Sequence, residues 1–234
     1  MNIKQNIDEI LKEIELTCKK TGRDSKDITV IAVSKTVDSM RAKEAVEAGI
    51  INLGENRVQE LIKKYEELQD TDVKWHMIGH LQKNKVKYII DKTVLIHSLE
   101  SIDLAEEINK RAIKNSLTAN VLIELNIGEE ESKFGVSEEY VYDFVKSMEQ
   151  FENIKVLGLM TVAPFCENPE DVRWVFKKMK NIYDKISTLN LKNTEMKYLS
   201  MGMTNDFEIA IEEGSNIIRI GTAIFGARKY KEED

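Results

Sequence analysis

A lysine at the end of a strand-like segment is the residue best suited to covalent chemistry. Lys35 follows the β-branched run at residues 28–33, and it shares a strand face with Val33 because side chains alternate along a strand. If Val33 points into the core, the amine of Lys35 opens at the edge of the sheet, where partial desolvation favours the neutral form. A neutral amine can attack an aldehyde. A lysine that simply ends a strand in solvent is the alternative, and position alone favours it.

Two turns rich in glycine and hydroxyl side chains could bind a phosphate. Ser200, Met201 and Gly202 leave one strand-like segment, and Gly221 and Thr222 leave the next. Backbone N–H groups brought close by glycine bind phosphate without a cationic side chain, with help from Ser and Thr hydroxyls. Helix capping and tight turns would explain the same residues, so both interpretations stay open.

An arginine and three histidines complete the residues with potential chemistry. Arg219 interrupts an apolar strand-like run, and a guanidinium there must be paired, either in a structural ion pair or with a ligand. His76 and His80 have a metal-like spacing, but Gly79 between them breaks the helical geometry that such a site needs. His97 lies near the end of another strand-like segment and could be a further polar group of the same region. We expect no metal site.

The elements that must position these residues alternate along the chain. An amphipathic helix over residues 2–20 ends at Gly22. Strand-like segments then follow at 28–34, 50–53, 74–78, 93–97, 120–127, 155–161, 197–201 and 216–220. Helical stretches lie between them at 39–48, 56–69, 81–90, 102–115, 137–149, 169–188 and 205–213.

This alternation predicts a closed barrel. Parallel strands need long crossover connections, and continuous apolar strands are buried on both faces. A (β/α)8 barrel typically takes ~250 residues, close to the 234 here, whereas an open doubly wound sheet usually stops at about six strands. No dinucleotide or P-loop motif is present. We therefore predict an α/β fold in which residues 1–234 form a single (β/α)8 TIM barrel domain with an extra N-terminal helix. Its functional groups should gather at the carboxyl ends of the strands.

Composition excludes several classes of protein. The sequence has 34 Lys and Arg against 41 Asp and Glu, a net charge of −7, whereas affinity for nucleic acid comes mainly from basic residues. No apolar run reaches the ~18 residues of a spanning helix, and the first residues lack the apolar segment of a signal peptide. Cys18 and Cys166 lie far apart, outside any zinc-ligand spacing. We expect a cytoplasmic protein with a small-molecule ligand and with no nucleic acid, membrane or disulfide.

Eight blocks of this sequence resemble, in order, the pyridoxal phosphate homeostasis protein family. The blocks are VIAVSKT at 30–36, LGENRVQE at 53–60, WHMIGHLQKNK at 75–85, HSLES at 97–101, LNIGEEESKFG at 125–135, GLMT at 158–161, LSMGMTNDFEIAIEEG at 199–214 and RIGTAIFG at 219–226. Each block alone says little, but together they cover nearly the whole chain.

The resemblance implies a cofactor and the residues that hold it. The cofactor is pyridoxal 5′-phosphate (PLP), bound as a Schiff base to the lysine matching Lys35, in a barrel similar to the N-terminal domain of bacterial alanine racemase. Its phosphate would lie on the two glycine-rich turns, and Arg219 matches the arginine that faces the pyridine nitrogen. The cofactor-binding residues expected in this way are Lys35, Asn56, His76, Ser200, Met201, Gly202, Arg219, Gly221 and Thr222.

The expected arginine contact argues against strong turnover. A guanidinium is no acid near neutral pH, so a pyridine nitrogen facing it stays unprotonated and the ring becomes a poor electron sink. Alanine racemases resembling this barrel carry a further C-terminal β domain and take a tyrosine from the partner subunit as second base. This sequence ends eight residues after Gly226, so we expect no such domain and a monomer, although Tyr230 stays open as a base.

Three functions follow as hypotheses. The first is a protein that holds PLP on Lys35 and serves its homeostasis and delivery, with apo PLP-dependent enzymes as recipients. The second is a PLP-dependent amino-acid racemase or lyase of the same fold. The third is a regulatory partner whose barrel mainly offers a docking surface. Lys133 could contact a second anion, but an exposed lysine is its default interpretation.

Overall fold

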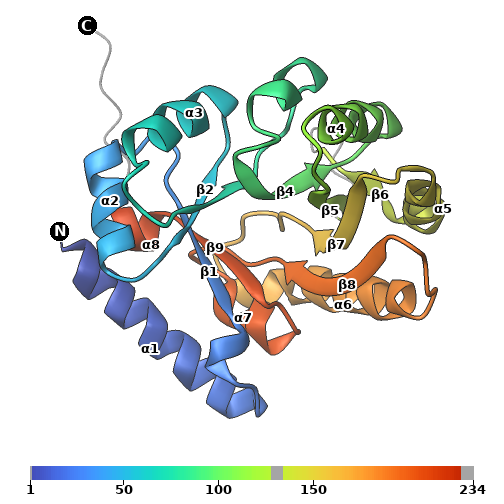
Figure 1. Ribbon diagram of the computed structural model, residues 1–234. Helices are drawn as coiled ribbons and strands as arrows, with labels where there is room; N and C mark the ends of the chain where they lie inside the picture. Colours follow the sequence, from blue (N-terminus) through green and yellow to red (C-terminus); the bar gives the residue numbers. More distant parts are fainter. Residues whose placement is uncertain (1, 128–133, 228–234) are drawn as a thin grey trace, which may run out of the picture.

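The computed structural model describes residues 2–127 and 134–227, and its centre is a closed ring of parallel strands (Figure 1). The strands of the ring are β1 (Thr29–Val33), β2 (Asn52–Glu55), β3 (Lys74–Met77), β4 (Thr93–Leu99), β5 (Ala119–Asn126), β7 (Ile154–Met160), β8 (Thr194–Ser200) and β9 (Ile217–Ile220). β1 pairs with both β2 and β9, and β4 pairs with β5, so the sheet closes on itself. The predicted (β/α)8 TIM barrel is confirmed.

Helices surround the ring. They are α2 (Ser39–Glu47), α3 (Val58–Glu67), α4 (Ile102–Lys114), α5 (Val141–Ser147), α6 (Arg173–Ser187), α7 (Phe207–Glu212) and α8 (Thr222–Phe225). Short 3₁₀ helices supplement them: η1 (Ser25–Asp27), η2 (Lys83–Tyr88), η3 (Glu138–Tyr140), η4 (Met148–Gln150) and η5 (Pro169–Val172). Within the two described ranges, no helix combines the length and the apolar character needed to cross a bilayer.

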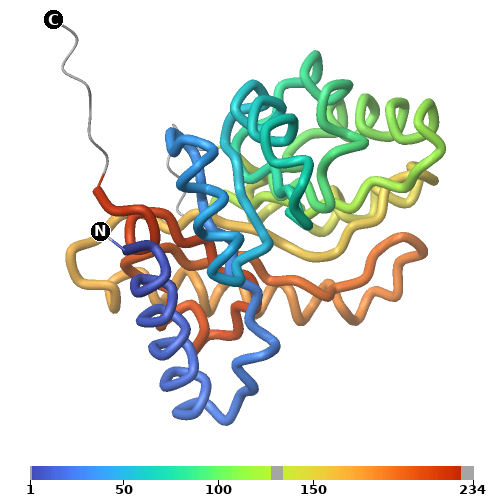
Figure 2. Tube along the Cα trace, turned by 60° about the vertical axis from the view of Figure 1, so that its left-hand side comes forward, coloured from blue at the N-terminus to red at the C-terminus, as the bar shows by residue number. Residues whose placement is uncertain are grey.

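The predicted N-terminal helix is present as α1 (Ile3–Thr21). The side chain of Asn2 caps its first turn, and Gly22 ends it in the left-handed region with φ +70°. Its apolar residues recur at three and four, so they form one face, which packs on α2, α7 and α8. Figure 2 shows the blue first helix beside the red last elements. Asn6 Nδ2 donates to the carbonyl oxygen of Ile224 at 2.8 Å, which fixes this contact.

The interior of the barrel holds a small apolar cluster. Its members are Ile31, Leu95, Leu122, Leu157, Met160 and Ile217. Where side chains alternate regularly along a strand, the residue two positions after an inward-facing one also points inward, closer to the carboxyl end. His97 follows Leu95 in this way, Arg219 follows Ile217, and Glu124 follows Leu122. His97, Arg219 and Glu124 therefore form a polar layer next to the apolar cluster, on the side of the carboxyl ends of the strands.

Three predicted helices differ in the structure. The predicted helix at 169–188 begins with η5 before α6, and the predicted helix at 81–90 is only the 3₁₀ helix η2. Val86 and Ile89, three residues apart, share one face of a 3₁₀ helix and are both buried. The predicted helix at 137–149 is divided into η3, α5 and η4, and before it β6 (Val136–Ser137) pairs with β5 outside the ring.

Candidate functional site

A cavity of about 840 Å³ opens over the carboxyl ends of the strands. It brings together five of the nine predicted cofactor-binding residues, which lie at or directly after the ends of three strands, β1, β2 and β9: Lys35, Asn56, Arg219, Gly221 and Thr222. Further walls come from the loop after β7, with Val162, Phe165 and Cys166. Most of these groups are distant in sequence, and they lie close together because the barrel is closed.

The other four predicted residues lie outside the lining of this cavity. His76, Ser200, Met201 and Gly202 are buried behind it, and the segment 203–206 forms the wall after β8 instead. Gly202 has φ +94°, and a Cβ there would lie 2.6 Å from the Cβ of Ala210, so this glycine serves the packing of the turn on α7. The residues of this loop that line the cavity, 203–206, directly follow the predicted Ser200, Met201 and Gly202.

The two loops expected to hold phosphate lie side by side. The N–H of Ala223 donates to Oγ1 of Thr204 at 3.4 Å, which joins the loop after β9 to the loop after β8. The N–H of Met203 donates to Asp206 Oδ1 at 2.6 Å, which closes the second loop into a turn. Residues of both loops therefore lie next to each other in the lining of the cavity.

Arg219 is buried on β9 and is held by neutral oxygens. Its Nη1 donates to Ser200 O at 2.9 Å and to Ser200 Oγ at 2.7 Å, and its Nη2 donates to Thr161 O at 2.8 Å. Within the described ranges, no carboxylate oxygen forms a salt bridge with it. Burial lowers the pKa of Arg219 to about 10, while the charges of Glu124 and Asp206 act in the opposite direction. The guanidinium is therefore a fixed cation at neutral pH.

A hydrogen-bond chain crosses the barrel interior from Arg219. His97 Nδ1 lies 3.1 Å from Ser200 Oγ, His97 Nε2 lies 3.0 Å from His76 Nδ1, and His76 Nε2 lies 3.1 Å from Asn52 Oδ1. Arginine can only donate, and the amide oxygen of Asn52 can only accept, so with both histidines neutral every proton in the chain points from Arg219 toward Asn52. Each neutral histidine then carries its proton on Nε2.

Burial keeps both histidines in that neutral state. It lowers the pKa of His76 to about 4, with help from the nearby charge of Lys74, and it lowers the pKa of His97 well below its usual value. Spacing in the sequence suggested a polar group near the cavity mouth for His97, but the structure buries it completely inside the ring. The alternation with Leu95 on β4 is the signal that could have revealed this.

Asn56 brings an unsatisfied acceptor to the cavity. Its Oδ1 is buried and has no hydrogen-bond partner among the described residues. Gly79, at the end of the neighbouring loop, allows this approach, because a Cβ at position 79 would lie 2.6 Å from the carbonyl oxygen of Asn56. A buried polar atom without a partner costs free energy, and a ligand donor would remove that cost.

His80 is part of a separate contact near the mouth. Its Nδ1 lies 2.8 Å from Glu100 Oε1, and its ring stacks on Phe134 with centroids 3.9 Å apart. The other carboxylate oxygen of Glu100 accepts from the N–H of Gly135 at 3.1 Å. No group of three or more metal-ligating side chains occurs in the part of the chain that the structure describes. Lys133 and Tyr230 lie outside the described residues.

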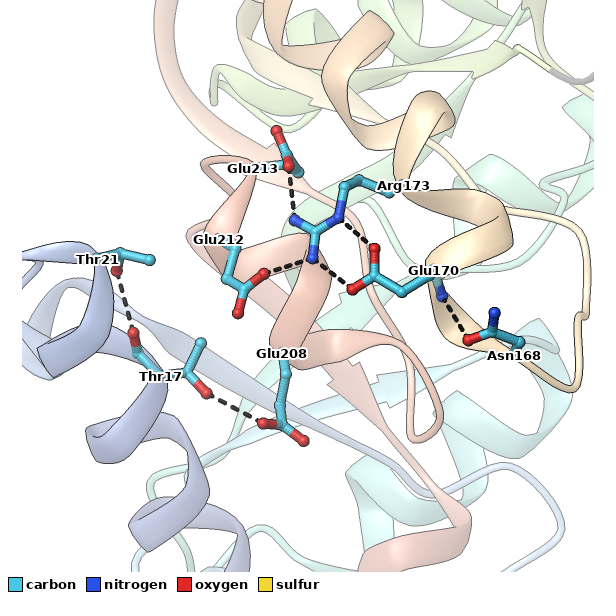
Figure 3. Close-up of polar contacts among 8 residues, drawn as sticks. All are labelled: Thr17, Thr21, Asn168, Glu170, Arg173, Glu208, Glu212 and Glu213. Carbon is cyan, nitrogen blue, oxygen red and sulfur yellow. Dashed lines mark hydrogen bonds and ion pairs between the residues drawn. The ribbon is translucent and has the colours of Figure 1, made fainter.

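Salt bridges hold the wall that follows β7. Arg173, at the start of α6, binds Glu170 at 2.6 Å, Glu212 at 2.6 Å and Glu213 at 2.7 Å (Figure 3). Glu170 belongs to η5, directly after the loop that contains Phe165 and Cys166, whereas Glu212 ends α7. Arg173 thus connects this side of the cavity to the helix that follows the phosphate-type loop.

Comparison with known proteins identifies the class and the family. The model of the alanine racemase N-terminal domain family matches residues 6–229, so the molecule is an alanine racemase-type barrel. The pyridoxal phosphate homeostasis protein of Aquifex aeolicus is 47% identical over 230 residues, covering 98% of this chain and all of that protein. The chain belongs to the pyridoxal phosphate homeostasis protein family.

Solved structures agree with this assignment. A protein of unknown function from Bifidobacterium adolescentis has a TM-score of 0.91 and 33% identity, covering 96% of this chain and 94% of its own. PipY of Synechococcus elongatus PCC7942, solved with PLP bound, has a TM-score of 0.79 and 28% identity, covering 92% of this chain and 100% of its own.

Proposed function

We propose that this protein binds PLP in the cavity, holds it as a Schiff base on Lys35, and serves the homeostasis and delivery of PLP in the cytoplasm. The observation that carries the proposal is the meeting of Lys35, Asn56, Arg219 and two glycine–hydroxyl loops around one cavity. Membership in the homeostasis family and the PLP-bound structure of PipY support it.

The residues present fit the chemical groups of PLP. Lys35 supplies the amine, the loops at 203–206 and 221–222 supply amide and hydroxyl donors for phosphate, and Arg219 supplies donors for a ring nitrogen. The unpaired Oδ1 of Asn56 can accept a hydrogen bond from the ligand. His76 and Ser200 would act from behind the cavity, since they reach it only through Arg219.

Attachment requires only the amine and the loss of water. The lone pair of Lys35 Nζ adds to the aldehyde carbon, and a C=N bond then replaces the C=O bond. A protonated Lys35 would first release one proton to solvent, and the aldehyde oxygen would then leave as water with the two hydrogens of the neutral amine. Bound PLP can supply electrophilic and electron-sink chemistry to amines.

Arg219 favours retention of the cofactor over turnover. Its guanidinium offers hydrogen atoms but is not an acid near neutral pH, so a ring nitrogen that faces it stays without a proton. Hydrogen bonds to Ser200 and Thr161 fix the orientation of the guanidinium. An unprotonated ring nitrogen makes bound PLP a weaker electron sink, which disfavours strong carbanion chemistry.

Absorbance and mass mapping test this function. Purified wild-type protein mixed with PLP should turn yellow, and borohydride should fix one PLP on the peptide that contains Lys35. Lys35→Ala should abolish the adduct. Lys155→Ala is the matched control, because Lys155 pairs with Glu195 at the opposite end of the barrel and should leave the adduct intact. Absence of colour, or an adduct elsewhere, would refute the site.

Delivery and oligomeric state need their own measurements. Loaded protein should activate an apo PLP-dependent enzyme faster than an equal concentration of free PLP, and an L-amino acid should not be racemised or cleaved. Steady conversion that disappears in Lys35→Ala would instead support a racemase or lyase. We expect a monomer by light scattering. Partners captured equally by wild type and Lys35→Ala would support a docking role in place of delivery.

A further inference from the structure

A buried ionic cluster surrounds the backbone on both sides of Lys35. Lys64, on α3, places its Nζ 2.6 Å from Glu55 Oε1 and 3.8 Å from Glu60 Oε2. The same Nζ donates to the carbonyl oxygen of Ser34 at 2.6 Å. Lys64 and Glu55 are buried, and the Glu60 side chain is 26% exposed. We call Glu55, Glu60 and Lys64 the ionic cluster.

The ionic cluster contacts the residue before Lys35 and the residue after it. Ser34 Oγ donates to Glu55 Oε1 at 2.6 Å, so Ser34 is held by its side chain as well as its carbonyl. The N–H of Thr36 donates to Glu60 Oε2 at 2.7 Å. The ionic cluster therefore holds both peptide neighbours of Lys35, Ser34 through Lys64 and Glu55, and Thr36 through Glu60.

The backbone after Lys35 adopts a conformation that needs such support. Thr36 has φ +64°, in the left-handed region that a β-branched residue rarely enters. A strained conformation persists only where the surroundings impose it. Here the bond to Glu60 fixes the N–H of Thr36, and the N–H of Val37 closes the turn on Ser34 O at 3.0 Å.

The arrangement is poorly explained by stability alone. A buried ion pair loses its hydration, and a well-packed apolar pair of similar volume often stabilises a fold as much. Glu55 Oε2 is buried without a hydrogen-bond partner among the described residues, which adds to the cost. The charged side chains form directed hydrogen bonds to Ser34 and Thr36, which apolar side chains could not form.

We propose that the ionic cluster is a positioning unit that presents the amine of Lys35 to the aldehyde of PLP. Glu60 holds Thr36, Lys64 holds Ser34, and Glu55 neutralises Lys64 and orients Ser34. This inference rests on the proposed function. Attack on a carbonyl carbon requires a defined approach, and a small misplacement of the nucleophile slows it by about 10- to 100-fold. The three residues act through the backbone of Lys35 and do not touch the ligand themselves.

Glu60 gives the cleanest test, because it is partly exposed and its replacement leaves the Lys64–Glu55 pair intact. Glu60→Leu removes the acceptor for the Thr36 N–H, whereas Glu60→Gln keeps an amide oxygen there. Asp70→Asn is the matched control, since it breaks the nearby Lys43–Asp70 ion pair, whose atoms lie 2.7 Å apart, without touching residues 34–36. The readout is the second-order rate constant for adduct formation with PLP, followed by absorbance at matched folded fractions.

We expect adduct formation about 10-fold slower or more in Glu60→Leu, within about twofold of wild type in Glu60→Gln, and unchanged in Asp70→Asn. A wild-type rate in Glu60→Leu, or an equal loss in Glu60→Gln, would overturn the proposal. If Glu60→Leu fails to fold, the double variant Glu55→Gln/Lys64→Met, which removes both buried charges together, must show the same slowing. Failure of wild type itself to form an adduct on Lys35 would refute the proposed function instead.

Discussion

The two buried histidines predict a specific loss of stability in acid. His76 has a pKa of about 4 in the folded protein, whereas an unfolded histidine titrates near 6.5. Above pH 6.5 neither state binds the proton, so the difference has no effect. As the pH falls below 6.5 the unfolded chain binds a proton that the folded protein excludes, and unfolding becomes more favourable.

The magnitude follows from the two pKa values. Linkage gives a loss of about 2 kcal/mol at pH 5 and about 3 kcal/mol at pH 4 from His76 alone. His97, whose pKa lies well below its usual value, adds a loss in the same direction. Glu124 acts oppositely, because burial raises its pKa to about 7 and the folded protein therefore gains a proton first as the pH falls.

Urea unfolding of matched variants separates these contributions. Between pH 7 and pH 5, the free energy of unfolding of His76→Gln should fall by about 2 kcal/mol less than that of wild type, because the carboxylate contributions cancel in the comparison. The control is His80→Gln, which alters the half-exposed histidine on Glu100 and should retain the wild-type pH dependence. Equal pH dependence in wild type and His76→Gln would refute a neutral, proton-excluding His76.

Three further predictions concern Ser200 and Arg219 of the hydrogen-bond chain and Gly158 on β7. Ser200→Ala removes the hydroxyl between Arg219 and His97 and should lower the free energy of unfolding by about 2 kcal/mol in urea, with Thr204→Ala nearly neutral. Arg219→Glu should protonate the ring nitrogen of bound PLP and shift its absorbance; an unchanged spectrum and pH profile would contradict the contact. Gly158→Ala should yield no folded protein by circular dichroism, because its Cβ would overlap the carbonyl oxygen of Tyr198. Gly49→Ala, strained only by φ +103°, should still fold, with a loss of about 1 kcal/mol.

The barrel could be predicted because it depends on local periodicity. Alternation places Lys35 two residues after Val33, and Arg219 two residues after Ile217, and both residues line the cavity. The same rule predicts that His97 faces inward, but it cannot predict that Ser200 and His76 meet its two ring nitrogens, since that depends on strand register across the ring.

The ionic cluster could not be predicted from spacing. Glu55 ends a strand and Lys64 lies in the following helix, so nine residues and a turn separate two atoms that lie 2.6 Å apart. Which residues of the loop after β8 line the cavity could not be predicted, for a related reason. Glycine marks a tight turn, but only the packing of Gly202 on Ala210 shows which residues of that turn face the cavity.

The contact between the first and last elements has a consequence for biosynthesis. β1 pairs with β9, and Asn6 binds Ile224, 218 positions away, so the ring cannot close until the last strand has left the ribosome. Long-range pairing of this kind slows folding, and an unpaired strand edge can pair with other chains. One edge of β1 therefore stays unpaired until β9 is available.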